Sequence, residues 1–400
     1  MNIFLSLFII FTGGILGGFL FEKIRLPKLI WYIILGLLIG PSLFNIVDDT
    51  LISISSYLRQ IALVIILTRS GLSLDINHLK KIGRPAILLC FIPATFEIIG
   101  VLIFAPMFLG ISYIEALLLG SVLAAVSPAI VVPRMINLIE KRYGEEHHIP
   151  ELIMAGASVD DIYVIVLFYS FKNLVATEVF NPWNIAQIPL SIVLGITLGI
   201  LVGFLMVFII KYLKFNKIIN VIFMLGLSIG MIYLEGLLKP YFSVSSLLAI
   251  IVMALIINIF KKEEAKEIQK SYNSLWSAFE ILLFTLVGIA TNAKYAFSKE
   301  GAILIGIIFI ALIFRSIGVI ISLLFTGYST KEKAFIIISY LPKATVQASI
   351  GAIALSEGLE CGTLVLTMAV LSILITAPVG AILMDTLYKK LLDNNAFIDS

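Results

Sequence analysis

Thirteen apolar runs, each long enough to cross a lipid bilayer, follow one another along this chain of 400 residues. A helix that spans a bilayer needs roughly 20 mostly apolar residues. The chain is 60% hydrophobic and only 13% charged, whereas soluble domains are about one quarter charged. The fold class predicted is therefore an all-α polytopic membrane protein. Its expected transmembrane helices are residues 2–20, 29–46, 51–72, 86–108, 113–137, 152–171, 185–210, 218–237, 241–260, 275–293, 302–326, 334–356 and 362–388.

The short loops between these runs leave no room for a soluble catalytic or nucleotide-binding domain. The sequence contains neither a phosphate-binding P-loop motif nor a dinucleotide-binding glycine motif. The two cysteines and three histidines have no metal-site or catalytic spacing. We therefore expect no enzyme activity, no cofactor and no nucleic acid partner. Any transport must use an ion or solute gradient.

The distribution of basic residues between the loops predicts the orientation. Of 28 basic residues, 20 lie on one side of the predicted spans, four on the other side and four within spans. Cytoplasmic loops carry the excess of Lys and Arg, so we expect the N-terminus outside and the C-terminus in the cytoplasm of a cell-membrane protein. A wrong number of spans would have scrambled this bias. The asymmetry therefore also favours thirteen helices.

Two adjacent aspartates, Asp160 and Asp161, lie about nine residues into the sixth predicted span. Ionisable groups in the membrane interior are costly and mark functional sites. Burial and a like charge nearby both favour protonation of a carboxylate. The pair should therefore hold a proton unless a monovalent cation replaces it, which is the chemistry of competitive proton and cation binding.

Two predicted spans are interrupted by proline. Ser127 and Pro128 open the motif SPAIVVP in the fifth span, and Lys343 follows a proline in LPKATVQA of the twelfth, ahead of Thr345 and Gln347. Broken helices at membrane depth occur only where the opened backbone is buried or lines a cavity, and paired interruptions indicate inverted repeats. We expect two discontinuous helices that cross, with spans 1–6 and 8–13 as the repeats. Lys343 is placed to offset the negative helix ends.

These motifs resemble the cation/proton antiporter superfamily, and within it the NHA-type sodium/proton antiporters. The similarity rests on SPAIVVP, on ASVDD with its aspartate pair, and on LPKATVQA, and it covers essentially the whole chain. By this resemblance Asp161 matches the essential ion-binding aspartate and Asp160 its acidic neighbour. Ser127 and Ser158 are further candidate ligands of the monovalent cation.

The resemblance also implies a homodimer that works by an elevator movement in the bilayer. A dimerisation domain would comprise residues 1–72 and 218–293, and a mobile core ion-transport domain residues 84–171 and 302–388. Residues 185–210 would form a linker helix between the two repeats. The two discontinuous helices would cross beside the aspartates in the core domain.

The sequence departs from the electrogenic antiporters of this superfamily, which carry a lysine in the span that corresponds to the eleventh. Arg315 stands there, in FRSIG, and a guanidinium cannot be deprotonated in a protein. Glu97 in the fourth span is the obvious counter-ion, so we expect Glu97 and Arg315 to form a fixed structural pair. The aspartate pair alone favours two protons per cation, whereas Arg315 favours one and thus electroneutral exchange.

The leading hypothesis is secondary antiport of Na⁺ or Li⁺ against H⁺. Potassium/proton exchange is an alternative within transport, because the same oxygen ligands serve both ions. An ion channel or a non-transporting membrane receptor is the alternative of another class. No filter-like repeat supports a channel, and a receptor would not need acidic residues in the membrane centre.

Overall fold

The computed structural model describes residues 2–74, 83–177, 182–213, 215–238, 241 and 244–393, and every regular element among these residues is a helix. Ten of the helical segments are long and apolar enough to cross a membrane, and three shorter apolar helices accompany them. This all-helical architecture confirms the predicted fold class. The thirteen apolar segments are consistent with the predicted number of spans.

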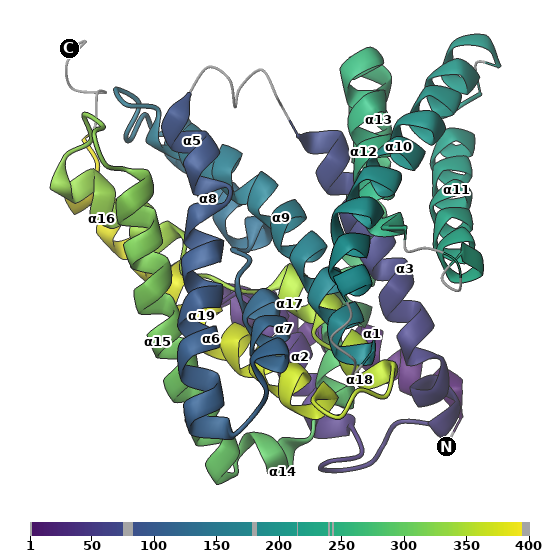
Figure 1. The fold of residues 1–400 in the computed structure, drawn as a ribbon, viewed down its shortest axis with the longest axis horizontal. Coiled ribbons are helices and arrows are strands. Elements are labelled where there is room, and N and C mark those ends of the chain that lie inside the picture. The colour runs from purple at the N-terminus through teal and green to yellow at the C-terminus, as the bar shows by residue number, and fades with distance from the viewer. Residues whose placement is uncertain are drawn as a thin grey trace. The chain divides into compact units, whose positions relative to one another are not determined.

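The described chain forms two compact units, and Figure 1 shows their helices. Unit 1 comprises Met1–Ser56, Asp75–Phe171 and Phe284–Ser400. Its helices, including α3, α9 and α13, which it shares with the other unit, are α1 (Ile3–Lys23), α2 (Lys28–Ile39), α3 (Asp49–Ser73), α5 (Arg84–Leu89), α6 (Ile92–Leu109), α7 (Tyr113–Leu123), α8 (Pro128–Glu140), α9 (Ile149–Thr177), α13 (Lys262–Ala290), α14 (Ala293–Ala296), α15 (Lys299–Ser322), α16 (Thr330–Ser339), α17 (Thr345–Ile350), α18 (Ile353–Ser356) and α19 (Gly362–Leu391).

Unit 2 comprises Tyr57–Leu74 and Lys172–Leu283. Besides the remainder of α3, α9 and α13, it contains α10 (Pro182–Tyr212), α11 (Lys217–Leu238) and α12 (Ser246–Phe260). Helices α10 and α12 pack closely because Gly195 and Gly199 let the two backbones approach. A Cβ on either glycine would lie 2.6 Å from a carbonyl oxygen of the facing chain segment.

Both predicted interruptions are present in unit 1. The fifth span consists of α7 and α8, separated by four non-helical residues, and the twelfth consists of α16 followed by the short helices α17 and α18. Pro128 is the first residue of α8, where a missing N–H costs nothing. Helices α7 and α17 contact each other near the centre of the unit (Figure 1).

The start of α7 and the start of α16 carry the same capping arrangement. Ser112 and Glu115 form a capping box at α7, and Ser329 and Glu332 form one at α16. Each box satisfies two backbone donors that a helix start leaves free. The two broken spans are therefore anchored alike at their first residues, as expected for repeated elements.

The charged segment of residues 261–270 between the ninth and tenth predicted spans mixes both signs at helical spacing, which predicts a solvated connecting helix, and it is helical. Residues 262–270 are the first turns of α13, which continues without a break to Ala290. Lys261, at the end of α12, makes the only change of direction between these two helices. Pairs of Lys and Glu three residues apart, such as Lys270 and Glu267, line the exposed side of this extension.

The division into contact-based units differs from the predicted functional domains. It groups α1 and α2 with the helices of the predicted core domain. Residues 1, 239, 240, 242 and 243 of the predicted dimerisation domain lie outside the described residues. The dimerisation, linker and core domains remain predictions, to which the proposed mechanism returns.

Candidate functional site

The two broken spans cross through direct backbone and side-chain hydrogen bonds. The Ser127 N–H donates to the carbonyl oxygen of Pro342 at 2.9 Å. The side-chain amide of Gln347 donates to the carbonyl oxygens of Leu123 at 3.2 Å and Ala125 at 2.8 Å. Leu123 is the last residue of α7 and Ala125 lies in the break that follows, where a helix end leaves acceptors without partners. Gln347 lies in the first turn of α17, which follows the break in the twelfth span. From there it bonds the backbone at the break in the fifth span.

Gln347 also closes its own helix start. Its Oε1 accepts a hydrogen bond from the Ala344 N–H at 2.9 Å. Thr345 is the first residue of α17 and is buried, and its carbonyl oxygen accepts a bond from the Ser349 hydroxyl. Thus LPKATVQA supplies the interruption, its cap and the bridge to α7.

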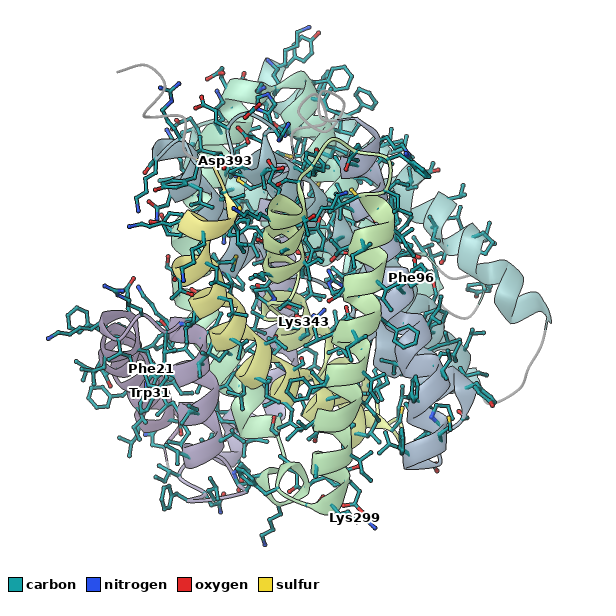
Figure 2. All side chains as sticks on the ribbon, turned by 90° about the vertical axis from the view of Figure 1, so that its left-hand side faces the viewer. Phe21, Trp31, Phe96, Lys299, Lys343 and Asp393 are labelled. Carbon is teal, nitrogen blue, oxygen red and sulfur yellow. The ribbon has the colours of Figure 1, made fainter. Side chains whose placement is uncertain are left out.

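Lys343 lies inside unit 1 with a fully buried side chain. Figure 2 shows it within the bundle, whereas Lys299 and Asp393 lie toward opposite ends. Its backbone N–H donates to the Thr376 hydroxyl of α19 at 2.9 Å, and its Nζ lies 2.6 Å from Glu97 Oε2. The sequence placed Lys343 near helix ends, but it did not reveal this ion pair with Glu97.

Arg315 occupies the centre of a buried network. Its Nη1 lies 2.6 Å from Glu97 Oε2, and its Nη2 lies 2.8 Å from Asp160 Oδ2. The side chains of all three residues are 0% exposed. The Nε atom donates to the Tyr340 carbonyl oxygen at 2.7 Å, and Nη1 also donates to the Ala124 carbonyl oxygen. Arg315 therefore does not form a closed pair with Glu97, because it also holds Asp160 and both interrupted backbones.

The two adjacent aspartates differ in their partners. Asp160 Oδ2 accepts hydrogen bonds from Arg315 and from the Val126 N–H, the latter at 2.8 Å. Asp161 has no ion pair within the described part of the chain, and its buried Oδ1 has no hydrogen-bond partner there. Its exposed fraction is 7%, compared with 0% for Asp160. The Oδ1 atoms of both aspartates lack a hydrogen-bond partner among the described residues, but only Asp161 also lacks an ion pair there.

The serines differ in the same way. Ser127 precedes Pro128 at the start of α8, and its buried Oγ has no hydrogen-bond partner among the described residues. Ser158 is half-buried and donates to the Met154 carbonyl oxygen at 2.8 Å, one turn earlier on α9. Each hydroxyl oxygen retains lone pairs that could bind a cation. The structure records no bond from either hydroxyl to the two aspartates.

Sequence reasoning missed three groups of this network: Thr376, Tyr340 and the Val126 N–H. Thr376 is one of several hydroxyl residues in an apolar span, so nothing marks it in the sequence. Tyr340 immediately precedes LPKATVQA and contributes a backbone carbonyl, which no side-chain pattern reveals. The Val126 N–H can bond Asp160 because Val126 lies in the non-helical residues after α7, and no side-chain pattern marks a backbone donor.

Inverted broken helices that cross beside buried carboxylates define a class of membrane transporter, the cation/proton antiporters. The chain matches the transmembrane sodium/hydrogen exchanger family over residues 7–390. It is 33% identical to sodium/hydrogen exchanger 9B2 of Homo sapiens, over 98% of this chain and 75% of that protein. It is 36% identical to sodium/hydrogen exchanger 9B1 of Mus musculus, over 98% of this chain and 72% of that protein.

Among solved structures, the sodium proton antiporter MjNhaP1 of Methanocaldococcus jannaschii shares the fold, with a TM-score of 0.81. The match covers 96% of this chain and 97% of that one at 22% sequence identity. The chain belongs to the sodium/hydrogen exchanger family. Members of this family are transporters, so the prediction of a multi-pass membrane transporter rather than an enzyme is confirmed.

Proposed function

We propose that this chain exchanges Na⁺ or Li⁺ for H⁺, and that the two ions compete for Asp161. The observation that carries the proposal is the contrast between the buried aspartates. Asp160 is held by Arg315 and a backbone donor, whereas Asp161 has no ion pair among the described residues. A buried carboxylate without a partner is unstable as a bare charge. It is therefore neutralised by either a proton or a cation.

The charges around the crossing favour an exchange of one cation for one proton. The network contains three carboxylates, Glu97, Asp160 and Asp161, and two basic groups, Arg315 and Lys343. With all five ionised, the cluster carries one net negative charge. One bound proton or one monovalent cation makes it neutral. Arg315 cannot release a proton, and in this proposal Lys343 keeps its proton in the ion pair with Glu97, so exchange at this site is electroneutral.

Ser127 and Ser158 complete the proposed cation site together with the aspartates. The free Oγ of Ser127 lies beside the backbone donor to Asp160, and Ser158 lies on the helix that carries both carboxylates. Hydroxyl and carboxylate oxygens are the ligands that hard cations prefer. In this arrangement Asp161 supplies the exchangeable charge. Asp160 keeps Arg315 in place and contributes its second oxygen, which has no partner among the described residues.

The proposed movement is of the elevator type in a homodimer. Residues 84–171 and 302–388 form the mobile core, residues 1–72 and 218–293 form the dimerisation domain, and residues 185–210 link the repeats. All groups of the charged network lie in the proposed core, and hydrogen bonds connect Glu97, Asp160 and Arg315 to one another and Arg315 to the backbone of both broken spans. A network bonded in this way moves as one body. The elevator movement therefore carries the ion together with its ligands.

We place the protein in the cell membrane with its N-terminus outside and its C-terminus in the cytoplasm. The basic residues support this orientation, because 20 of the 28 lie in the loops assigned to the cytoplasm. Cysteines introduced singly at exposed positions near each end test it. A membrane-impermeant thiol reagent applied to intact cells should label a cysteine at Asn2 and should not label one at Lys390.

Proteoliposomes containing the purified protein test the central proposal. A pH-sensitive dye inside the vesicles should report proton flux on addition of Na⁺ or Li⁺ and none on addition of choline. Flux with K⁺ in place of Na⁺ would favour the potassium/proton alternative. Cation uptake without proton movement would favour a channel, and no flux of either ion would favour a receptor.

The substitution Asp161→Asn should abolish cation-dependent proton flux, because an amide cannot exchange a proton for a cation. The expected loss is at least ~100-fold, the scale of losing one essential charged group. Asp49→Asn is the matched control, since Asp49 is exposed at the start of α3. Full activity in a folded Asp161→Asn protein would refute the proposed site.

A further inference from the structure

Tyr340 holds Arg315 with two different parts of the residue. Its carbonyl oxygen accepts the Arg315 Nε–H at 2.7 Å, and its ring lies beneath the guanidinium, with the Arg315 Cζ 5.4 Å from the ring centroid. Tyr340 is fully buried at the end of α16. Cations over aromatic faces are attracted most strongly in such dry surroundings. The ring and the main chain together define where the guanidinium lies.

The phenol oxygen of Tyr340 has no hydrogen-bond partner among the described residues. A buried hydroxyl without a partner costs about 1–3 kcal/mol, so hydrogen bonding does not explain its position. The oxygen instead fills a notch in α9 at Gly156. A Cβ added to Gly156 would lie 1.9 Å from the Tyr340 Oη and 3.3 Å from its Cζ. Only glycine at this position admits the oxygen.

Gly156 lies four residues before Asp160 on α9, so the two occupy the same side of the helix one turn apart. Tyr340 consequently lies between the two halves of the Arg315–Asp160 ion pair: its ring lies under Arg315, and its phenol oxygen meets Gly156 on the helix that carries Asp160. Its rigid length separates the guanidinium from the α9 backbone by a fixed distance.

We propose that Tyr340 and Gly156 are positioning residues that act as a spacer between Arg315 and α9 and so set the location of the two aspartates at the crossing. This inference rests on the proposed function, because ion exchange at Asp161 is what the spacer adjusts. Neither residue touches the transported ion. Displacement of a reacting group by about 1 Å can cost 100-fold in activity, so a change of fit in the notch should alter ion affinity.

A size-exchange experiment tests the spacer. Gly156→Ala should raise the apparent KM for Na⁺ by about tenfold or more and shift the pH profile of exchange, since the new Cβ displaces α9 from Arg315. Tyr340→Phe alone should change the KM less than Gly156→Ala does, because it removes an oxygen that has no hydrogen-bond partner and leaves the ring beneath Arg315 in place. The double variant Gly156→Ala/Tyr340→Phe should recover to within about threefold, because the 1.9 Å conflict disappears. Gly306→Ala on α15 is the control, because a Cβ there meets nothing within 4 Å.

Two results would overturn the proposal: a KM for Gly156→Ala within about twofold of wild type, or a double variant as impaired as Gly156→Ala. If Gly156→Ala does not fold, the double variant decides, since restored folding with near-normal KM supports the spacer and an unfolded double variant refutes it. The melting temperatures of wild type, the two single variants and the double variant provide a readout that does not depend on transport. If wild type exchanged no ions, the proposed function would fail, whereas non-additive melting temperatures would still support the contact between Tyr340 and Gly156.

Discussion

Asp160 and Asp161 are consecutive residues with different surroundings, and this contrast could not be read from the sequence. The motif ASVDD indicated that both carboxylates lie at membrane depth. Which of them faces Arg315 depends on the rotation of α9 against α15 and on the backbone break after α7. The sequence could therefore predict the chemistry of the pair. It could not show which aspartate binds Arg315 and which one has no ion pair. Only the family resemblance singled out Asp161.

Lys343 provides a prediction at the scale of one residue. Lys343→Ala removes one of the two cations that share Glu97 Oε2, leaving a buried charge less compensated. Loss of a partner from a buried ion pair destabilises by about 3–5 kcal/mol. We expect a lower melting temperature and loss of cation-dependent proton flux, and Lys343→Arg should retain part of the activity.

Thermal melting in detergent and flux in proteoliposomes measure the two effects of Lys343→Ala separately. The backbone bond from residue 343 to Thr376 persists in both variants, so it serves as a constant background. A Lys343→Ala protein that melts and transports like wild type would show that the charge has no part in holding the crossing.

At the scale of elements, the interrupted spans were predictable and their partners were not. Proline marked the breaks at Pro128 and Pro342, because it removes a backbone donor and frees a carbonyl. Gln347, which bonds the carbonyl oxygens of Leu123 and Ala125 where α7 ends, is more than 200 positions away from them. The sequence marked Gln347 as part of the motif and offered no means of pairing it with α7. Likewise, the spacing of the charged residues after Lys261 predicted a connecting helix, but no pattern showed that this helix continues without a break into the tenth span as α13.

Gln347→Leu should weaken the crossing itself. The change leaves the carbonyl oxygens of Leu123 and Ala125 and the Ala344 N–H without their bonds. Each unsatisfied buried group costs about 1–3 kcal/mol. We expect a drop of several degrees in melting temperature and at least a tenfold loss of flux. Gln60→Leu, at an exposed position on α3, should leave both unchanged; a wild-type melting curve for Gln347→Leu would contradict the bridging role.

His147 in the loop before α9 contacts Glu332 at the start of α16, and both residues lie outside the predicted spans. The His147 Nδ1 and Glu332 Oε1 atoms are 2.7 Å apart. This hydrogen bond raises the pKa of His147 above its ordinary 6.5, and the negative charges of Glu146 and Asp393 add to the effect. Burial raises the pKa of Glu332, but the bonds from His147 and Ser329 outweigh it and leave that pKa below its ordinary 4.5. Tyr328 also faces the imidazole, edge to face.

The sign of the pH effect follows from these shifts. The stabilisation from His147 is complete below pH 6.5 and is lost as the pH rises through its raised pKa, whereas that from Glu332 is complete above pH 4.5 and is lost as the pH falls through its lowered pKa. The pair should therefore stabilise most between these two values. Because the His147 side chain is 39% exposed, the effect should be about 1 kcal/mol or less.

Melting temperatures from pH 4 to pH 9 measure this contribution. The difference between wild type and His147→Gln should be largest near pH 5.5 and should shrink toward pH 9. His148→Asn is the control, since His148 is exposed with a positive φ that asparagine tolerates. A difference that grew with rising pH would contradict the assignment.

At the scale of the whole molecule, the apolar runs and the positions of the basic residues predicted the helical membrane fold. Length alone does not identify the short helices α2 and α12, with 12 and 15 residues, as spans. Their expected lengths in the sequence were greater, because apolar loop residues next to them cannot be distinguished from helix. The apolar runs therefore predicted the number of segments better than their ends.

Electroneutral exchange is the prediction that belongs to the whole transport cycle. With one proton or one monovalent cation bound, the charges of the network and of the bound ion sum to zero. Neither the proton-loaded nor the cation-loaded movement should therefore carry net charge across the membrane. A membrane potential would contribute about 2.3 kcal/mol per charge per 100 mV to an electrogenic cycle. The Na⁺ gradient that just balances a fixed pH gradient should be the same with and without a potassium diffusion potential. A balance point that shifts with voltage would rule out one-for-one exchange.

The long separation between the two halves of the crossing also affects how the protein is made. The Leu123 and Ala125 carbonyls enter the membrane during synthesis 224 and 222 residues before Gln347. At ~5–20 residues per second, the opened end of α7 waits for about 10–40 s for its partner. Asp160 likewise emerges 155 residues before Arg315. During this interval water or the insertion machinery must shelter the polar break. We therefore expect the N-terminal repeat to remain incompletely packed until the second repeat is made.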